Sequence, residues 1–330
     1  MPQLSRVTLL YRGDAHPTDF VPRQISAKEE NMNQVTSTAP ANAVAEGRLP
    51  DFVILGAMKC GTTSLHDYLN HHPDIAMSQP KELNFFVEHQ RWGRGLRWYK
   101  SNFTEPGKVM GESSPNYTRY PLFSGVAQRM YAAMPDVKLI YCVRDPIRRM
   151  VSHYIHDYSI GEEDKPFSEV ALDEDKAYLW CSRYHHQLEQ YLTFYEASQI
   201  KIVVLEDLKE KPQETLRDVF AFLGVTSIQD VRFEANSGTM PPAKTRRRNP
   251  LKSWMRRNNV RGMYWLERNV PWVFGSPIEQ PEIGEDLHQK LLEKLQADTG
   301  AFREATGLEL AQWRWVPRGG DERKRTRASR

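Results

Sequence analysis

The sequence predicts an α/β fold in which helices flank a central parallel sheet on both sides. Short apolar runs of strand length recur along the chain, at residues 52–55, 137–143 and 200–205. Segments with helical spacing lie between them, and such alternation is typical of parallel sheets with helices on both faces. The first strand, bounded by Gly56 and Gly61, runs through a tight turn into a helix. The expected fold is therefore a P-loop-like, three-layer fold.

Each expected element follows from a local pattern. Apolar runs predict the strands. The helices are predicted by apolar residues at helical spacing, by proline at the first helical position and by glycine just after the last one. A charged stretch at 162–176 is expected to be a surface loop. The expected strands are 52–55, 74–77, 109–112, 137–143 and 200–205; the expected helices begin at 62 and span 121–134, 146–158, 184–195, 212–223 and 285–305.

The 330 residues are long enough for one large α/β domain. We expect a loosely ordered N-terminal arm over 1–48, a single domain over 49–317 and a basic tail over 318–330. No apolar run approaches the roughly 20 residues that span a bilayer. Three cysteines (Cys60, Cys142 and Cys181) show neither a disulfide framework nor metal-ligand spacing. These features predict reduced thiols, a cytoplasmic setting and no metal site.

The turn between the first strand and helix is the first candidate site. Amide N–H groups at a helix start, together with the helix dipole, favour a bound phosphate. A nucleoside-triphosphate P-loop reads GxxxxGK[ST], but Thr62 stands where its lysine would be and Lys59 lies inside the turn. This pattern favours one phosphate with a cation beside its leaving group. The alternative is a structural turn with a surface lysine.

A second anion site is expected after the strand 137–143. In open α/β sheets, ligands bind at the carboxyl ends of the strands. Arg144 follows this strand, and Ser152 lies two turns into the next helix; a guanidinium fork and a hydroxyl suit a second phosphate. Asp145 is expected to cap that helix or to orient Arg144. The alternative is that Arg144 pairs with a local carboxylate and that Ser152 is an ordinary residue on the helix surface.

Positive charge is concentrated in two segments. Residues 244–261 hold eight Lys/Arg and no acidic residue, and residues 318–330 hold six basic and two acidic residues, within a net charge of +3. Such segments favour anionic partners. The stretch 244–252 has three open interpretations: it closes over a nucleotide, it binds an anionic acceptor, or it is a solvated loop.

The motifs together resemble sulfotransferases that use 3′-phosphoadenosine 5′-phosphosulfate (PAPS), of the heparan-sulfate-type and bacterial branch. The stretch 56–65 (GAMKCGTTSL) resembles the 5′-phosphosulfate loop, and 144–154 (RDPIRRMVSHY) resembles the 3′-phosphate motif. Residues 81–86 (KELNFF), 112–117 (ESSPNY) and 204–208 (VLEDL) resemble further segments of the family. The likeness covers about 50–225.

The resemblance implies a role for each candidate residue, with PAPS as the sulfuryl donor and no metal. Lys59 would stabilise charge on the leaving phosphate, and Glu82 would take the proton of an acceptor hydroxyl on a small metabolite or glycan. Burial beside Phe85 and Phe86 would raise the proton affinity of Glu82. The implied cofactor contacts are Lys59, Cys60, Gly61, Thr62, Thr63, Ser64, Arg144, Ser152, Arg247 and Arg248; the implied acceptor contacts are Asn84, Phe85, Ser113 and Tyr117.

Two departures from the heparan-type pattern bear on the acceptor. Asn84 stands where those relatives carry His, and Ser113 stands where they carry Lys. Two other functions remain open. A kinase-like phosphotransferase would need Mg²⁺ and a helix-start lysine. A nucleic-acid-binding protein would use the basic segments and bind in a salt-dependent manner.

Overall fold

The computed structural model describes residues 47–228 and 278–313. The arm, the basic segment 244–261, the tail, and with them Arg247 and Arg248, lie outside these described residues. Within the described part, no helix is long and apolar enough to cross a bilayer.

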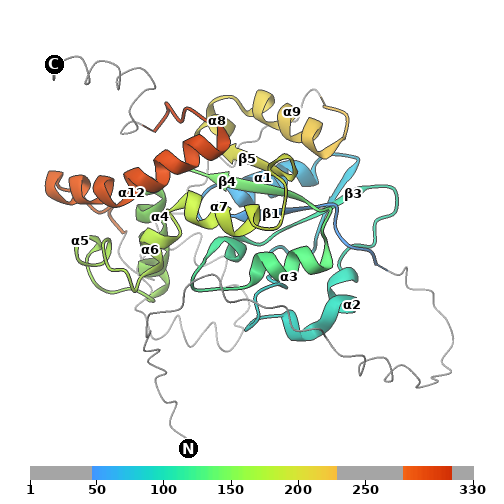
Figure 1. Cartoon of the computed structure of the whole chain (residues 1–330), viewed down its shortest axis with the longest axis horizontal. Coiled ribbons are helices and arrows are strands. Elements are labelled where there is room, and N and C mark those ends of the chain that lie inside the picture. The colour runs from blue at the N-terminus through green and yellow to red at the C-terminus, as the bar shows by residue number, and fades with distance from the viewer. Residues whose placement is uncertain (1–46, 229–277, 314–330) are drawn as a thin grey trace, which may run out of the picture. The chain divides into compact units, whose positions relative to one another are not determined.

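Five parallel strands form the central sheet in the order β2-β3-β1-β4-β5 (Figure 1). The first strand along the chain thus lies in the middle, and the chain extends the sheet first on one side and then on the other. This order creates a switch point at the carboxyl ends of β1 and its neighbours, where open α/β sheets bind ligands. The strands are β1 (Phe52–Gly56), β2 (Ile75–Met77), β3 (Val109–Ser113), β4 (Lys138–Val143) and β5 (Ile200–Val204).

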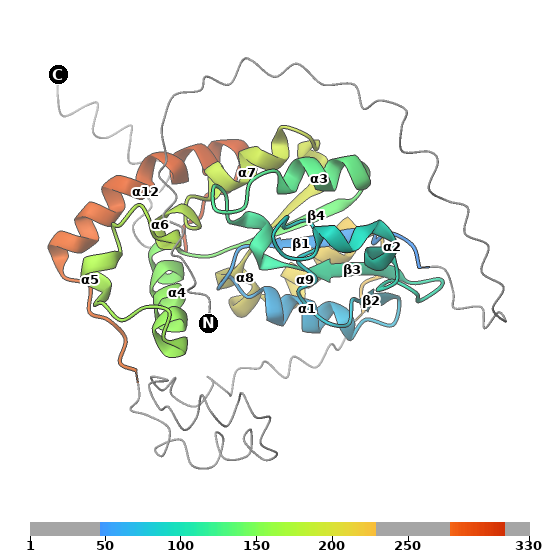
Figure 2. The same ribbon diagram turned by 90° about the horizontal axis from the view of Figure 1, so that it is seen from below.

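Two apolar cores cover the two faces of the sheet, because successive side chains of a strand point to opposite faces. Phe52 and Ile54 of β1 pack with α1 and α9, whereas Val53 and Leu55 pack with α3. Figure 2 shows α1 and α3 on opposite sides of the strands. The longer helices are α1 (Thr62–Asn70), α3 (Val126–Ala133), α4 (Pro146–Ile160), α7 (Tyr184–Leu192), α9 (Pro212–Leu223) and α12 (Glu285–Thr306).

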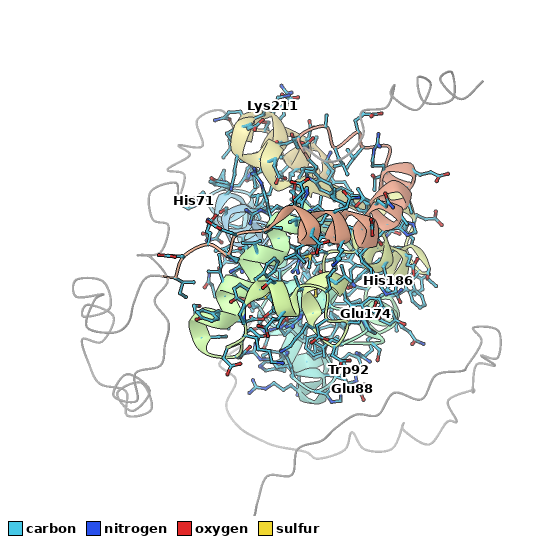
Figure 3. The ribbon with its side chains drawn as sticks, turned by 90° about the vertical axis from the view of Figure 1, so that its left-hand side faces the viewer. His71, Glu88, Trp92, Glu174, His186 and Lys211 are labelled. Carbon is cyan, nitrogen blue, oxygen red and sulfur yellow. The ribbon has the colours of Figure 1, made fainter. Side chains whose placement is uncertain are left out.

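Shorter helices complete the described part. They are α2 (Gly95–Lys100), α5 (Phe167–Val170), α6 (Ala177–Trp180) and α8 (Leu205–Glu210), with 3-10 turns η1 (Trp92–Arg94), η2 (Pro115–Thr118) and η3 (Ala197–Gln199). In Figure 3 the molecule is seen from the side of α12, where Glu174 and His186 are labelled. Glu174 accepts a bond from Lys294 of α12 at 3.2 Å, so this helix is tied to the rest of the domain.

The predicted α/β fold is confirmed, and the differences have local causes. Helix α3 begins at Val126 rather than at 121, because Gly125 before it adopts a left-handed conformation (φ 70°). The stretch 162–176 is not simply a surface loop: Phe167 and Val170 of α5 are buried against α4. Leu205 starts helix α8 instead of ending a strand.

Candidate active site

The turn after β1 presents the free N–H groups of a helix start. The first described bond of α1 runs from the Leu65 N–H to the Gly61 carbonyl at 3.0 Å, so the amides of residues 62–64 precede the helical ladder. No side chain of the described residues caps this end. Lys59 lies in the turn with φ 71° and a half-buried side chain. The arrangement suits an anion at the helix start with a cation beside it.

Two glycines of this turn cannot be replaced without movement. Gly61 has φ 83°, and a Cβ there would lie 2.5 Å from Leu205 Cδ1. At Gly56, with φ 141°, a Cβ would lie 2.2 Å from Thr118 Oγ1. The turn is therefore packed against η2 on one side and α8 on the other, which fixes the position of its amides.

The structure places Arg144 next to this turn. β1 and β4 are neighbouring strands, and Gly56 pairs with Tyr141. Arg144 directly follows β4, and its Nη1 donates to the Lys59 carbonyl at 3.4 Å. The two predicted anion motifs are 85 residues apart in sequence at this contact. They thus meet at the carboxyl ends of two neighbouring strands, where open α/β sheets bind ligands.

Of the two roles expected for Asp145, the structure shows the helix cap: its Oδ1 accepts the Arg148 N–H at the start of α4 at 2.9 Å. Ser152 is half-buried two turns along α4. Arg149 of the same motif is fully buried and donates to Ser182 Oγ and, at 2.7 Å, to the Tyr178 carbonyl. Arg149 is therefore a structural residue, whereas Arg144 lies at the candidate site.

Tyr184 of α7 links the two motifs. Its hydroxyl donates to the Arg144 carbonyl at 2.7 Å and accepts the Arg144 N–H at 3.3 Å. The Cys60 thiol lies 3.4 Å from the same hydroxyl, and burial raises the pKa of Cys60 to about 11. The Cys60 N–H already donates to the Ala57 carbonyl at 3.1 Å. Cys60 thus supports the turn from inside rather than facing a ligand.

The predicted base Glu82 lies beside the start of α1. Lys81 Nζ donates both to Glu82 Oε1 at 2.8 Å and to Thr63 Oγ1 at 3.2 Å. The Glu82 side chain is 47% exposed. The expectation of partial burial against Phe85 and Phe86 is thus wrong, because both rings turn into the core while the carboxylate turns toward Lys81.

The predicted acceptor residues fall into two groups. Phe85 and Tyr117 are buried, and the Tyr117 hydroxyl donates to Glu112 Oε1 at 2.9 Å, so both support the loop from beneath. Asn84 Oδ1 and Ser113 Oγ are buried atoms with no hydrogen-bond partner among the described residues. A bound molecule is one way to satisfy such atoms, because an unpaired buried polar atom is costly.

Glu112 is a buried acid for which the sequence indicated no role. Its side chain is fully buried at the end of β3 and accepts hydrogen bonds from three hydroxyls. Burial raises the pKa of Glu112 to about 7, against the opposing effect of those bonds. The ESSPNY stretch, to which Glu112 belongs, was a local sequence signal for this residue, but its bond with Tyr99 spans 13 residues and is not a local pattern. The role of Tyr184 was missed for the same reason, since it lies 40 residues from Arg144.

The sequence model of the sulfotransferase domain family matches residues 49–257. The chain is 34% identical over 135 residues to the membrane-associated sulfotransferase kil1 of Dictyostelium discoideum, covering 38% of this chain and 27% of that protein. It is 29% identical over 192 residues to heparan sulfate glucosamine 3-O-sulfotransferase 5 of Homo sapiens, covering 54% of each. The match thus spans about half or less of these curated relatives.

Among solved structures, a sulfotransferase from Alicyclobacillus acidocaldarius superposes with a TM-score of 0.60 at 25% identity. The match covers 81% of this chain and 99% of that protein. The family match includes the turn after β1, the Glu82 loop and the Arg144 motif. The chain belongs to the sulfotransferase domain family.

Proposed function

We propose that this protein transfers the sulfuryl group of PAPS to an acceptor hydroxyl, with Glu82 as the base and Lys59 stabilising the leaving phosphate. The observation that carries the proposal is the contact of the Arg144 guanidinium with the Lys59 carbonyl at 3.4 Å, which places the second cationic motif beside the turn that precedes the helix-start amides. One nucleotide with a 5′- and a 3′-phosphate needs two anion sites in this proximity. A single nucleoside phosphate does not need the second.

The residues present fit such a donor. The amides of Thr62, Thr63 and Ser64, at an end of α1 that no described side chain caps, would hold the 5′-phosphate. Arg144 and Ser152 would hold the 3′-phosphate. PAPS supplies an activated sulfuryl group: its S–O bond to the phosphate breaks while a new bond to the acceptor oxygen forms, and 3′-phosphoadenosine 5′-phosphate (PAP) leaves.

Within that reaction, Lys59 places its positive charge where negative charge develops on the leaving oxygen. Removal of such a group commonly costs on the order of 10²–10³ in kcat. Glu82 is half exposed, so an acceptor from solvent has access to its carboxylate. The acceptor proton would pass to Glu82, and Lys81 holds the carboxylate near Thr63 until then.

We further propose that Asn84 and Ser113 contact the acceptor, since each has a buried polar atom that no described residue satisfies. Both are neutral. Two relatives are named for sulfation of heparan sulfate, one at an oxygen and one at a nitrogen. For this chain a neutral contact pair favours an acceptor that carries little charge at this point, and we propose that its reacting group is a hydroxyl of a small metabolite or a glycan.

Titration calorimetry with PAP tests the donor. We expect micromolar affinity, and about 10- to 100-fold weaker binding of adenosine 5′-phosphate, which lacks the 3′-phosphate that Arg144 would hold. Equal affinity for the two nucleotides contradicts the proposal. Tighter binding of Mg²⁺-ATP than of PAP would support a kinase instead. Transfer of labelled sulfate from PAPS to panels of hydroxyl- and amine-bearing compounds then identifies the acceptor class.

A further inference from the structure

The loop that carries Glu82 has an unfavourable backbone conformation. Glu82 has φ 64° and Asn84 has φ 48°, both in the left-handed region that non-glycine residues seldom adopt. Each such conformation costs roughly 1–3 kcal/mol, and it persists only where contacts with the surrounding structure offset that cost. The hydrogen-bond partners of this loop are therefore part of the machinery that places Glu82.

Two backbone N–H groups of this loop are bound by hydroxyls. The Asn84 N–H donates to Ser114 Oγ at 2.9 Å, and the Phe86 N–H donates to the Tyr117 hydroxyl at 3.5 Å. A hydroxyl that accepts a hydrogen bond from one group has its own O–H free to donate to a different group. Ser114 donates to Glu112 Oε2 at 3.0 Å, and Tyr117 donates to Glu112 Oε1 at 2.9 Å. Both relays from the loop thus end on one carboxylate.

We propose that Glu112 is the positioning residue of the Glu82 loop, acting through Ser114 and Tyr117. Because its carboxylate accepts both hydroxyl protons, each hydroxyl keeps a lone pair directed at the loop. A third donor, the Tyr99 hydroxyl of α2, lies 2.7 Å from Oε1 and belongs to neither of these two relays. The consequence for catalysis rests on the proposed role of Glu82, whereas the positioning itself does not.

The relay depends on the ionised form of Glu112. A protonated carboxyl would have to donate, and one hydroxyl would then lose its acceptor and turn. Burial raises the pKa of Glu112 to about 7, so this change falls near neutral pH. The titratable or charged groups that act on Glu112 are Tyr99, Tyr117, Tyr191 of α7 and Arg91, whose positive charge favours the ionised form.

Hydrogen exchange of the full chain, resolved to single amides by fragmentation mass spectrometry, tests the relay without donor or acceptor. We expect the Asn84 amide to exchange at least about 10-fold faster in Ser114→Ala and Glu112→Gln, because its acceptor is removed or turned. Tyr99→Phe is the matched control, compared at a pH well above 7 where Glu112 is ionised: it removes a hydroxyl from the same carboxylate, and Asn84 should stay within about twofold of wild type. Residues 52–65 should be unchanged in all three.

Unchanged Asn84 exchange in both Ser114→Ala and Glu112→Gln would overturn the proposal, as would equal loosening in Tyr99→Phe. If Glu112→Gln does not fold, the pH dependence of Asn84 protection tests Glu112 instead: it should be present in wild type and absent in Ser114→Ala. In wild type, protection of Asn84, corrected for intrinsic exchange, should fall as the pH drops through about 7, and this dependence should vanish in Glu112→Gln. Loosened exchange in Ser114→Ala with normal sulfate transfer would keep the relay and show that the position of the loop does not limit transfer.

Discussion

Glu82 is positioned through its backbone more than through its carboxylate. Its N–H donates to the Ser113 carbonyl at 3.1 Å, and Arg91 donates to its carbonyl at 3.3 Å. The carboxylate itself is 47% exposed and pairs with Lys81. An exposed pair of this kind contributes little to stability. Substitution of the Glu82 side chain should therefore alter chemistry while leaving the fold intact.

Replacement of Glu82 by Gln removes the proposed base without changing the size of the side chain. We expect kcat for sulfate transfer to fall by roughly 10²–10⁴ while PAP affinity stays the same. Glu88→Gln is the control, because Glu88 is a nearby exposed glutamate (63%) paired with Arg129. A Glu82→Gln enzyme with near-normal kcat would show that another group takes the proton.

Arg144 should matter for donor affinity. Loss of its guanidinium removes the charge proposed to hold the 3′-phosphate, so Arg144→Ala should weaken PAP binding by about 10- to 100-fold in calorimetry. Adenosine 5′-phosphate, without that phosphate, should bind the variant and the wild type alike. Arg217→Ala, an exposed arginine of α9, controls for the loss of one positive charge. Equal weakening of both nucleotides would place Arg144 elsewhere in the site.

Glu112 should make stability depend on pH in a defined direction. Its pKa is raised from 4.5 to about 7, so between these values the folded state binds a proton that the unfolded state has lost. Its contribution to the free energy of unfolding is therefore fully present below pH 4.5 and falls as the pH rises to 7, by on the order of 3 kcal/mol.

Urea unfolding of wild type and Glu112→Gln across this range measures the effect. The difference in free energy of unfolding should move in favour of the variant as the pH rises, and should be constant above about pH 8. Parallel pH profiles of the two proteins would mean that folding does not raise the pKa of Glu112.

At the scale of elements, the turn between β1 and α1 depends on close packing with α8. Gly61 needs a positive φ, and a Cβ there would approach Leu205 to 2.5 Å. The amides of residues 62–64 are therefore placed by packing against α8, whose first residue, Leu205, lies 144 residues after Gly61.

Gly61→Ala should both destabilise the protein, by about 1–3 kcal/mol, and weaken PAP binding, since the turn must shift to admit the methyl group. Gly300→Ala, in α12 with open space around the added Cβ, should instead raise the melting temperature slightly. Thermal unfolding with and without PAP measures both effects. A Gly61→Ala protein with normal PAP affinity would show that these amides do not hold the ligand.

Sequence patterns predicted the elements that carry the site, because strands, glycine turns and helix starts are local signals. The adjacency of Gly56 and Arg144 also followed, since both end parallel strands of one sheet. The exposed side chain of Glu82 was not predicted, because its neighbours Phe85 and Phe86 suggested burial whereas the left-handed backbone of Glu82 turns its side chain outward. The convergence on Glu112 was also missed, since the hydroxyls of Ser114 and Tyr117 nearby in sequence are joined there by Tyr99 of α2, which lies 13 residues away.

At the scale of the whole molecule, the C-terminal helix α12 supports the site from a distance. Asp298 of α12 accepts the N–H groups of His185 and His186 at 3.1 and 2.9 Å, and thereby caps the start of α7. Tyr184, the first residue of α7, bonds Arg144. A chain of contacts therefore runs from α12 through α7 to the second anion motif.

Asp298→Ala should lower the free energy of unfolding by about 1–3 kcal/mol, because two amides of α7 lose their acceptor. PAP affinity should fall with it, as Tyr184 loosens. Glu174→Ala removes the exposed partner of Lys294 on the same helix and should change stability by less than about 0.5 kcal/mol. Loss of stability with unchanged PAP affinity would restrict α12 to a structural role.

The central claim is that two neighbouring anion sites bind one doubly phosphorylated nucleotide, and a crystal structure of the protein with PAP tests it most directly. We expect the 5′-phosphate on the amides of residues 62–64, with Lys59 turned toward it, and the 3′-phosphate on Arg144 and Ser152. A nucleotide bound away from the carboxyl ends of β1 and β4, or a 3′-phosphate without contact to Arg144, would contradict the account.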